Sequence, residues 1–70
     1  MRKYLVIYEP GDDGSWGAYS PDIDGVVVSM DTREEAEEAM RVGIAMFIEE
    51  LEARGEPAPA PRNLAGYVAA

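Results

Sequence analysis

Between residues 31 and 55, apolar residues recur at intervals of three and four, which is the spacing of one face of an α-helix. The stripe consists of Ala36, Met40, Gly43, Phe47 and Leu51, widened by Ala39, Ile44 and Ile48. Asp31 or Thr32 can cap the first turn, and Thr32 with Glu35 fits the reciprocal capping box. Gly55 can take the left-handed conformation that ends a helix. The pattern predicts one amphipathic helix that needs an apolar surface to lie on.

Three shorter stretches before this helix have the composition of β-strands. They are residues 4–8 (Tyr-Leu-Val-Ile-Tyr), 16–19 (Trp-Gly-Ala-Tyr) and 26–30 (Val-Val-Val-Ser-Met). Turn-forming clusters of Pro, Gly and Asp separate them at residues 10–15 and 21–25. We expect the first strand to be buried on both faces or nearly so, and Trp16 and Tyr19 to lie on opposite faces of the second. The order predicts a three-stranded antiparallel meander with the helix packed on one face.

After the helix, residues 56–62 carry a proline at every second position and cannot be helical, because proline lacks the N–H that a helix needs. We expect a stiff extended connector there, with a ligand for a polyproline-binding domain as the alternative. Residues 64–68 could form a short C-terminal strand, weakened by Gly66. The fold class is therefore α+β, with the element order β-β-β-α-β in a single domain over residues 1–70.

Composition limits what such a domain can do. The chain has 70 residues and neither cysteine nor histidine, so it has no disulfide, no thiolate metal site and no imidazole base. A core this small is marginal alone, and oligomerisation is the usual remedy. The apolar run from Tyr4 to Tyr8 follows Arg2 and Lys3 but ends at Glu9, which makes it too short for a signal peptide. No stretch is long enough to span a membrane. We expect a cytoplasmic protein with no membrane contact.

The chain is strongly acidic, with 14 acidic and six basic residues and a formal net charge of −8. This charge disfavours direct contact with nucleic acid and favours a basic partner, although an acidic surface can also serve solubility alone. Glutamates crowd the first turns of the predicted helix, where the helix dipole favours negative charge. We interpret this run as a solvated face, with Glu37–Arg41 and Glu50–Arg54 as expected ion pairs at a spacing of four.

The part of the sequence from residue 9 to residue 36 is more specific. It contains Glu9-Pro10, an acidic glycine turn, an aromatic strand, the loop Ser20-Pro21-Asp22-Ile23-Asp24-Gly25, and then Met30-Asp31-Thr32 and Glu34-Glu35-Ala36. This arrangement resembles the HicB-like antitoxin family, whose hallmark is a Phe-Pro-Asp-Leu-Pro-Gly loop followed by a Gly-Asp-Thr-x-x-Glu-Ala helix start. The end of the helix and its proline exit, from Glu49 to Pro59, are also similar. Ser20, Asp24 and Met30 depart from the usual residues of the family.

The resemblance implies a partial ribonuclease H-like fold and an antitoxin that neutralises a small basic, HicA-type, mRNA-cleaving toxin by occlusion. Many members carry an additional domain that binds operator DNA, and we expect no separate DNA-binding domain in residues 1–70. The alternative function is an orphan HicB-like domain that forms homo-oligomers and has a structural or other protein-interaction role. Either interpretation predicts a homodimer or higher oligomer, held by a free sheet edge or by the outer face of the sheet.

Six residues are candidates for partner binding: Trp16, Tyr19, Pro21, Asp22, Ile23 and Asp24. Aromatic side chains often anchor interfaces, and loop carboxylates can meet a basic surface. Each has a structural alternative, because Pro21, Asp22 and Gly25 can simply shape a turn. In so small a domain, Trp16 is also more often a core residue than an anchor.

Catalysis is not expected. Ribonuclease H chemistry needs several carboxylates converging on two metal ions about 3.5–4 Å apart. The candidates by residue type are Asp12, Asp13, Asp22, Asp24 and Asp31. All of them fall in predicted turns or caps, which explain aspartate without a metal. We therefore predict no catalytic residue, no cofactor and no bound metal.

Overall fold

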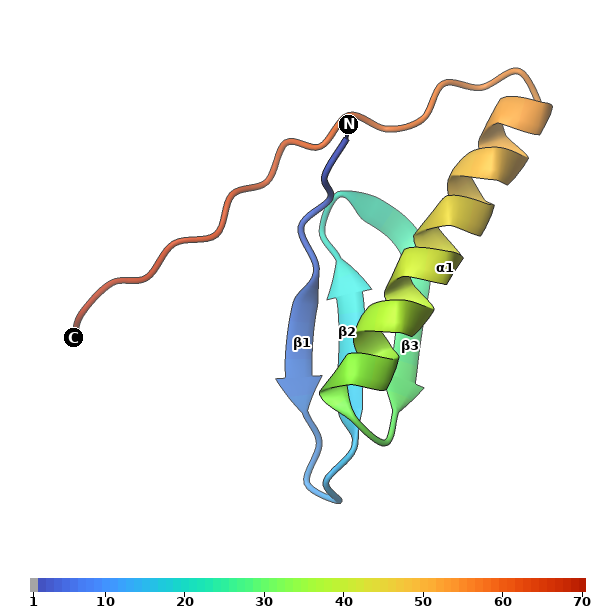
Figure 1. The fold of residues 1–70 in the computed structure, drawn as a ribbon. Helices are drawn as coiled ribbons and strands as arrows, with labels where there is room; N and C mark the ends of the chain where they lie inside the picture. The colour runs from blue at the N-terminus through green and yellow to red at the C-terminus, as the bar shows by residue number, and fades with distance from the viewer. Residues whose placement is uncertain (1) are drawn as a thin grey trace.

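The structure is a computed structural model that describes residues 2–70. Three antiparallel strands, β1 (Ile7–Pro10), β2 (Trp16–Ser20) and β3 (Ile23–Met30), form a sheet in the order β1-β2-β3. A single long helix, α1 (Arg33–Ala53), follows and lies across one face of the sheet (Figure 1). The predicted α+β meander with one helix is confirmed.

The ends of α1 form as the sequence predicts. Thr32 is the N-cap, and its Oγ1 accepts from the backbone N–H of Glu35 at 3.1 Å while the Glu35 carboxylate accepts from the N–H of Thr32 at 3.1 Å. At the other end Gly55 has φ +77°, and the N–H of Glu56 donates to the carbonyl of Leu51 at 2.9 Å. This closing turn satisfies carbonyls that the helix leaves unpaired.

The core lies between α1 and the inner face of the sheet. Its buried members are Ala18, Ile23, Ala36, Met40 and Ile44. The apolar stripe predicted for the helix supplies the last three, so the helical period identified its buried face correctly. The helix packs on β2 and β3 and leaves the side of β1 largely uncovered, as Figure 1 shows.

The first strand lies further along the chain than the sequence suggests. We predicted residues 4–8, but the ladder joins Ile7 to Tyr19 at one end and Pro10 to Trp16 at the other. If the register between β1 and β2 continued toward the N-terminus, Leu5 would face Pro21, which belongs to the β2–β3 turn. The N–H of Leu5 instead donates to the carboxylate of Asp22 at 3.1 Å. Tyr4 to Tyr8 are only half-buried, so the expectation of burial on both faces is corrected.

The third strand begins three residues before the predicted start, directly after a two-residue turn. Tyr19 pairs with Val27 but Ser20 pairs with Ile23, so the register breaks between these two pairs. The extra residues on β3 include Gly25, whose φ of +99° is a conformation that other residues rarely adopt. This bulge bends the start of β3 and turns Ile23 into the core, where it is 1% exposed.

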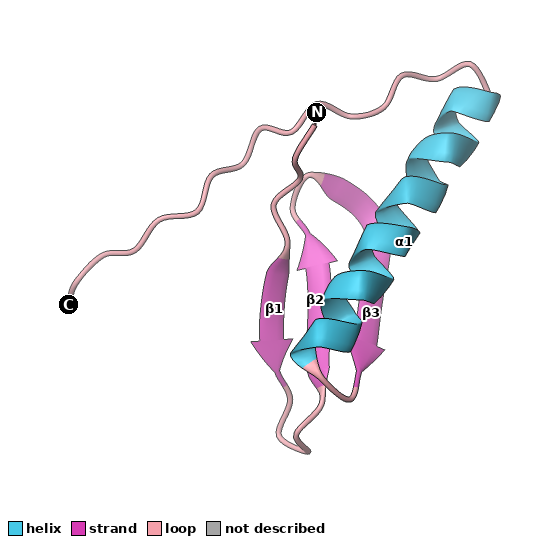
Figure 2. Cartoon of the chain, viewed as in Figure 1, coloured by secondary structure: helices cyan, strands magenta, loops and turns pink. Residues whose placement is uncertain are grey.

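Beyond α1 the chain is extended and irregular (Figure 2). The hydroxyl of Tyr4 donates to the carbonyl of Pro59 at 2.7 Å, which fastens the connector to the start of the chain. The short strand predicted over residues 64–68 is not formed within residues 2–70. A strand needs backbone hydrogen bonds to a neighbouring strand, and this segment makes no such ladder. The partial ribonuclease H-like fold implied by the resemblance stays a prediction. In the described part of the chain, α1 is too polar to qualify as a membrane-crossing helix.

Candidate partner-binding surface

The structure spreads the six candidate binding residues over both faces of the sheet and one turn. Trp16 lies on the inner face and packs against the core, which favours the structural interpretation of this residue. Tyr19 lies on the outer face, 36% exposed, opposite the 75% exposed side chain of Val27. No element covers this outer face within residues 2–70 (Figure 1). Tyr19 is therefore accessible to a partner, whereas Trp16 offers only part of its ring.

The β2–β3 turn separates accessible residues from buried ones. Pro21 and Asp24 are exposed. Ile23 is among the most buried side chains of the molecule, and a partner could reach it only if the core opened. Whether any of the six residues contacts a partner stays a prediction, but the geometry gives Ile23 a place in the core.

Asp22 holds together three segments that are far apart in the sequence. Its carboxylate accepts from the N–H of Leu5 at 3.1 Å and from the N–H groups of Arg62 and Asn63 at 3.1 and 3.0 Å. The side-chain amide of Asn63 donates to the same oxygen as the two backbone groups. Partial burial raises the pKa of the Asp22 carboxyl, but these hydrogen bonds outweigh it and leave the pKa below its usual value. Asp22 thus fixes where the C-terminal segment leaves the domain.

A groove lies between α1 and the first strand, and we call it the α1–β1 groove. It encloses about 1180 Å³, which exceeds the ~300–1000 Å³ of typical small-molecule sites. Its floor is apolar and comes from both elements: Tyr4, Val6, Tyr8, Met40, Ile44 and Ile48. The groove exists because α1 packs on β2 and β3 and leaves the inner face of β1 open.

Carboxylates line the helix side of the groove. Glu34, Glu37 and Glu38 border it, and Glu38 binds Arg41 through two contacts, one of them 3.0 Å from Nε to Oε1. The expected Glu37–Arg41 pair is therefore replaced by Glu38–Arg41, at a spacing of three. Arg54 pairs with Glu56 at 3.2 Å and not with Glu50, the partner that the sequence predicts. The hydrogen bond from Arg41 lowers the pKa of Glu38.

Tyr8 lies at the edge of this groove. The Arg33 guanidinium is 5.5 Å from the centre of its ring, a cation–π distance. Burial and the nearby charge of Glu37 raise the pKa of the Tyr8 hydroxyl, and the charge of Arg33 opposes that rise. Tyr8 therefore stays neutral at physiological pH and presents an uncharged aromatic surface between charges of both signs.

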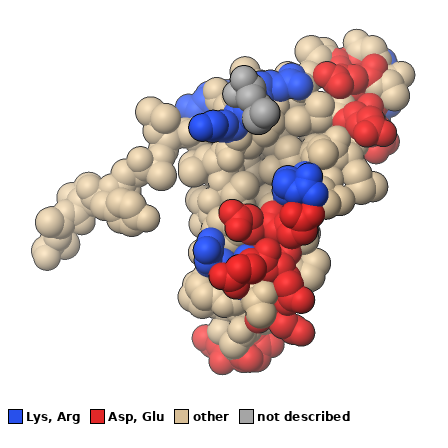
Figure 3. Space-filling view, viewed as in Figure 1, with Lys and Arg blue, Asp and Glu red and all other residues tan. Residues whose placement is uncertain are grey.

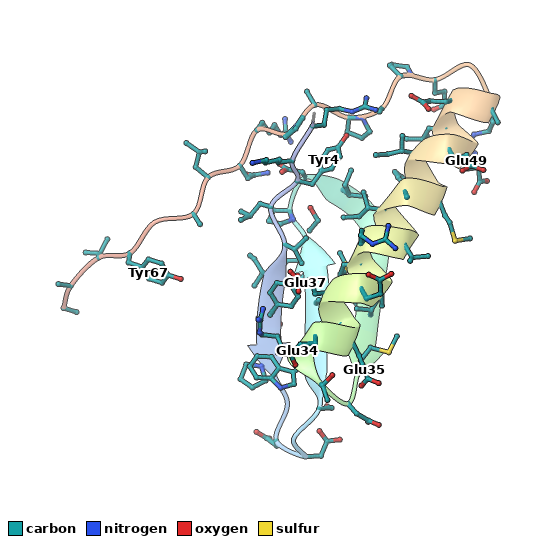
Figure 4. All side chains as sticks on the ribbon, in the orientation of Figure 1. Tyr4, Glu34, Glu35, Glu37, Glu49 and Tyr67 are labelled. Atoms are coloured by element: carbon teal, nitrogen blue, oxygen red, sulfur yellow. The ribbon has the colours of Figure 1, made fainter. Side chains whose placement is uncertain are left out.

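The charge of the groove is uneven along its length. Figure 3 shows acidic side chains along the first half of α1, at the tip of the β1–β2 turn and again at the far end of α1, with basic side chains gathered around the start of the chain. Figure 4 shows Glu34 and Glu37 on the groove side of α1, whereas Glu49 lies near the far end of the helix. Arg2 and Lys3 border the basic end. A protein partner lying in the groove would thus meet opposite charges at its two ends.

Sequence reasoning missed this groove. Tyr4, Val6 and Tyr8 have the alternation of one strand face, but the sequence does not show that the helix leaves that face uncovered. The glutamates of the first helical turns were interpreted as a solvated face, and they are exposed, yet three of them border the groove. The Asp22 contacts with Arg62 and Asn63 had no detectable signal either, because they join residues 40 and 41 positions apart.

The five aspartates proposed by residue type do not converge. Asp12 and Asp13 lie in the β1–β2 turn, and Asp31 follows the end of β3 beside it. Asp22 and Asp24 lie at the opposite end of the sheet, because β2 runs from one end to the other. Asp13 accepts from the N–H and hydroxyl of Ser15 at 3.0 and 2.6 Å, which is turn chemistry. Among residues 2–70, no group of three or more potential acidic ligands is placed to hold a metal ion.

Comparison with known proteins identifies the family. Residues 4–70 match the family described as HicB_like antitoxin of bacterial toxin-antitoxin system. No curated protein and no solved structure matches the chain. The match spans the sheet, the helix and the extended C-terminal segment that Asp22 holds. With nearly every residue included in that match, the chain belongs to the HicB-like antitoxins of bacterial toxin–antitoxin systems.

Proposed function

We propose that this antitoxin neutralises a small basic, HicA-type toxin that cleaves mRNA, and that it does so by occlusion. The antitoxin covers the basic surface with which the toxin holds RNA, so the toxin cannot bind its substrate. The protein itself performs no catalysis and uses no cofactor. It acts in the cytoplasm without direct contact to nucleic acid or membrane.

The observation that carries this proposal is the α1–β1 groove, with its apolar floor and its acidic helix side. An apolar centre supplies most of the affinity of a protein interface, and surrounding charges set the association rate and orientation. The acidic half of the groove complements an RNA-binding surface, which must itself be basic. Outside the groove, the proposed contacts are the exposed residues Tyr19, Pro21 and Asp24, together with Asp22 and part of Trp16.

The first experiment is co-expression of this chain with the protein encoded beside it. A small basic neighbour with a single histidine on a predicted strand would be the expected toxin. We expect the two proteins to elute together in a defined ratio, and excess antitoxin to abolish cleavage of mRNA by the toxin. Full cleavage in the presence of excess antitoxin would refute the proposal for that pair.

A second experiment tests the groove. Glu34→Gln and Glu37→Gln remove two charges from its border without changing side-chain shape, and should weaken toxin binding roughly 2- to 30-fold, mainly through slower association at low salt. Glu49→Gln with Glu50→Gln is the matched control, since it removes the same charge from the last turns of the same helix, where Figure 4 shows Glu49. Equal losses for both pairs would assign the effect to net charge and not to the groove.

The second candidate function is an orphan domain whose partner is another copy of itself. The observation that favours it is a group of apolar side chains in the C-terminal segment that contact almost nothing: Leu64, Tyr67 and Val68. The two functions are separable, because a homodimer can also bind a toxin. Elution of the chain alone as a homo-oligomer, with the neighbouring protein absent from the peak, would favour the orphan domain.

A further inference from the structure

We propose that residues 64–68 pair with the free edge of β1 in a second copy of this chain, and that the exchange is reciprocal. The structure shows two unpartnered features that fit one another, an open strand edge and an extended apolar segment. The inference concerns the assembly of the antitoxin and holds whether or not a toxin is bound.

The first feature is the edge of β1. Among residues 2–70, the sheet order β1-β2-β3 leaves β1 with a neighbour on one side only, so the backbone N–H and carbonyl groups of β1 that do not point toward β2 face outward. Natural proteins rarely leave such an edge open, because it can pair with any extended segment. The edge is short, and one strand of about five residues would cover it.

The second feature is the C-terminal segment. Leu64, Tyr67 and Val68 are 95%, 101% and 93% exposed, so their side chains touch almost nothing in the single chain. In an extended conformation Leu64 and Val68 share one face and Tyr67 lies on the other. Figure 4 shows Tyr67 on the part of the segment that has left the sheet. Apolar side chains exposed to this degree need a partner to be shielded from water.

The hydrogen bonds of the Asp22 carboxylate to Leu5, Arg62 and Asn63, which we call the Asp22 tether, bring the C-terminal segment next to the edge of β1. Because the carboxylate binds the N–H groups of Arg62 and Asn63 as well as that of Leu5, the segment departs beside the start of the first strand. A gap of about 490 Å³ separates residues 5–8 from residues 64–67. In Figure 1 the segment leaves on the side of β1 and diverges from it. Residues 64–68 therefore begin next to the open edge of β1 but do not pair with that edge, and their side chains stay exposed to solvent.

The segment avoids the charge repulsion that otherwise opposes the pairing of two copies. Each copy carries a net charge of −8, so two copies repel wherever their carboxylates approach. Residues 63–70 contain no charged side chain, so two copies can share this segment without bringing carboxylate side chains together. Reciprocal exchange is an isologous contact that closes the assembly at a dimer, because each copy both donates a segment and accepts one. It also adds buried apolar area to a core that is small for independent stability.

Size measurement with charged variants of the full chain tests the surface. Wild-type protein should be a dimer by light scattering at micromolar concentration. Leu64→Asp with Val68→Asp should weaken dimerisation by at least about a hundredfold, since two apolar side chains lose their burial. Val42→Asp with Met46→Asp, two exposed apolar positions on α1, should leave the dimer intact. A monomeric wild type, or a dimer that survives Leu64→Asp with Val68→Asp, would overturn the proposal.

Cross-linking distinguishes exchange from pairing within one chain. Because the chain has no cysteine, a single introduced thiol is the only reactive one. Chains carrying Ile7→Cys are mixed with chains carrying Gly66→Cys and treated with a short bismaleimide, with the exposed Glu9→Cys as a second β1 variant should Ile7→Cys fail to fold. A cross-linked species containing one chain of each kind supports the exchange. A cross-link that forms only within a chain carrying both cysteines would refute it.

Discussion

Ile23 was a candidate partner contact in the sequence, and its position in the structure predicts a different phenotype. Its side chain is 1% exposed and packs with Ala18 and Met40. Replacing a buried isoleucine by alanine removes apolar contacts and leaves a cavity, which together cost about 2–5 kcal/mol, whereas replacement by valine costs about 0.5–1.5 kcal/mol. A chain of 70 residues has a total free energy of unfolding of only about 4–10 kcal/mol. Ile23→Ala should therefore remove a large part of the stability.

The assays are thermal unfolding and urea unfolding, each followed by circular dichroism and by Trp16 fluorescence. Both are run at one fixed protein concentration because dimer dissociation also shifts the midpoint. We expect the thermal midpoint of Ile23→Ala to fall by at least about 8 °C, and that of Ile23→Val by a few degrees. Val27→Ala is the matched control, since Val27 is a β-branched residue of the same strand that is 75% exposed on the outer face. Its midpoint should change little.

Two outcomes would refute this reasoning. If Ile23→Ala unfolds at the same urea concentration as Val27→Ala, the side chain is not in the core. If Ile23→Ala keeps its stability and loses binding to a partner, then Ile23 is a surface contact, as the sequence first suggested.

Three further predictions concern the ends of α1 and the Asp22 tether. Thr32→Ala should lower the free energy of unfolding by about 1 kcal/mol in chemical denaturation, whereas Thr32→Ser should preserve it, because either hydroxyl can cap the helix. Gly55→Ala should cost about 1–2 kcal/mol since φ is +77° there, and Gly66→Ala, at a position without a positive φ, should cost almost nothing; equal effects would show that the closing turn does not need glycine. The lowered pKa of Asp22 means that its tether contributes stability above the ordinary aspartate value of 3.8 and loses it as the pH falls through the lowered pKa. The amide resonance of Asn63 should therefore titrate below pH 3.8, and a midpoint above that value would contradict the tether.

The tether also gives a physical reason for the Pro-Asp turn that contributed to the family resemblance. The loop was interpreted either as a turn or as a binding site. In the structure Asp22 has two roles. Its carboxylate accepts from the N–H of Leu5, just before the β1–β2 ladder, and also from the N–H of Asn63, where the C-terminal segment leaves the domain. Asp22→Asn would replace an acceptor of four donors by an amide and should loosen this departure point before it affects the sheet.

The sequence by itself determined the elements whose causes are local. The period of apolar residues fixed the buried face of α1, the hydroxyl of Thr32 fixed its start and Gly55 its end, because each of these effects acts over a single turn of chain. The alternation in β2 likewise placed Ala18 inside and Tyr19 outside, since successive strand residues face opposite ways.

Only the tertiary structure decided the features that join distant residues. The shift of β1 depends on Leu5 finding the carboxylate of Asp22 instead of a ladder carbonyl. The burial of Ile23 depends on a bulge that the sequence showed only as a glycine in a turn. The α1–β1 groove depends on the helix packing on β2 and β3 and not on β1. The open edge of β1 depends on residues 64–68, which form no strand with the other described residues. No local pattern encodes these features, because each is decided by competition among contacts between elements far apart in the sequence.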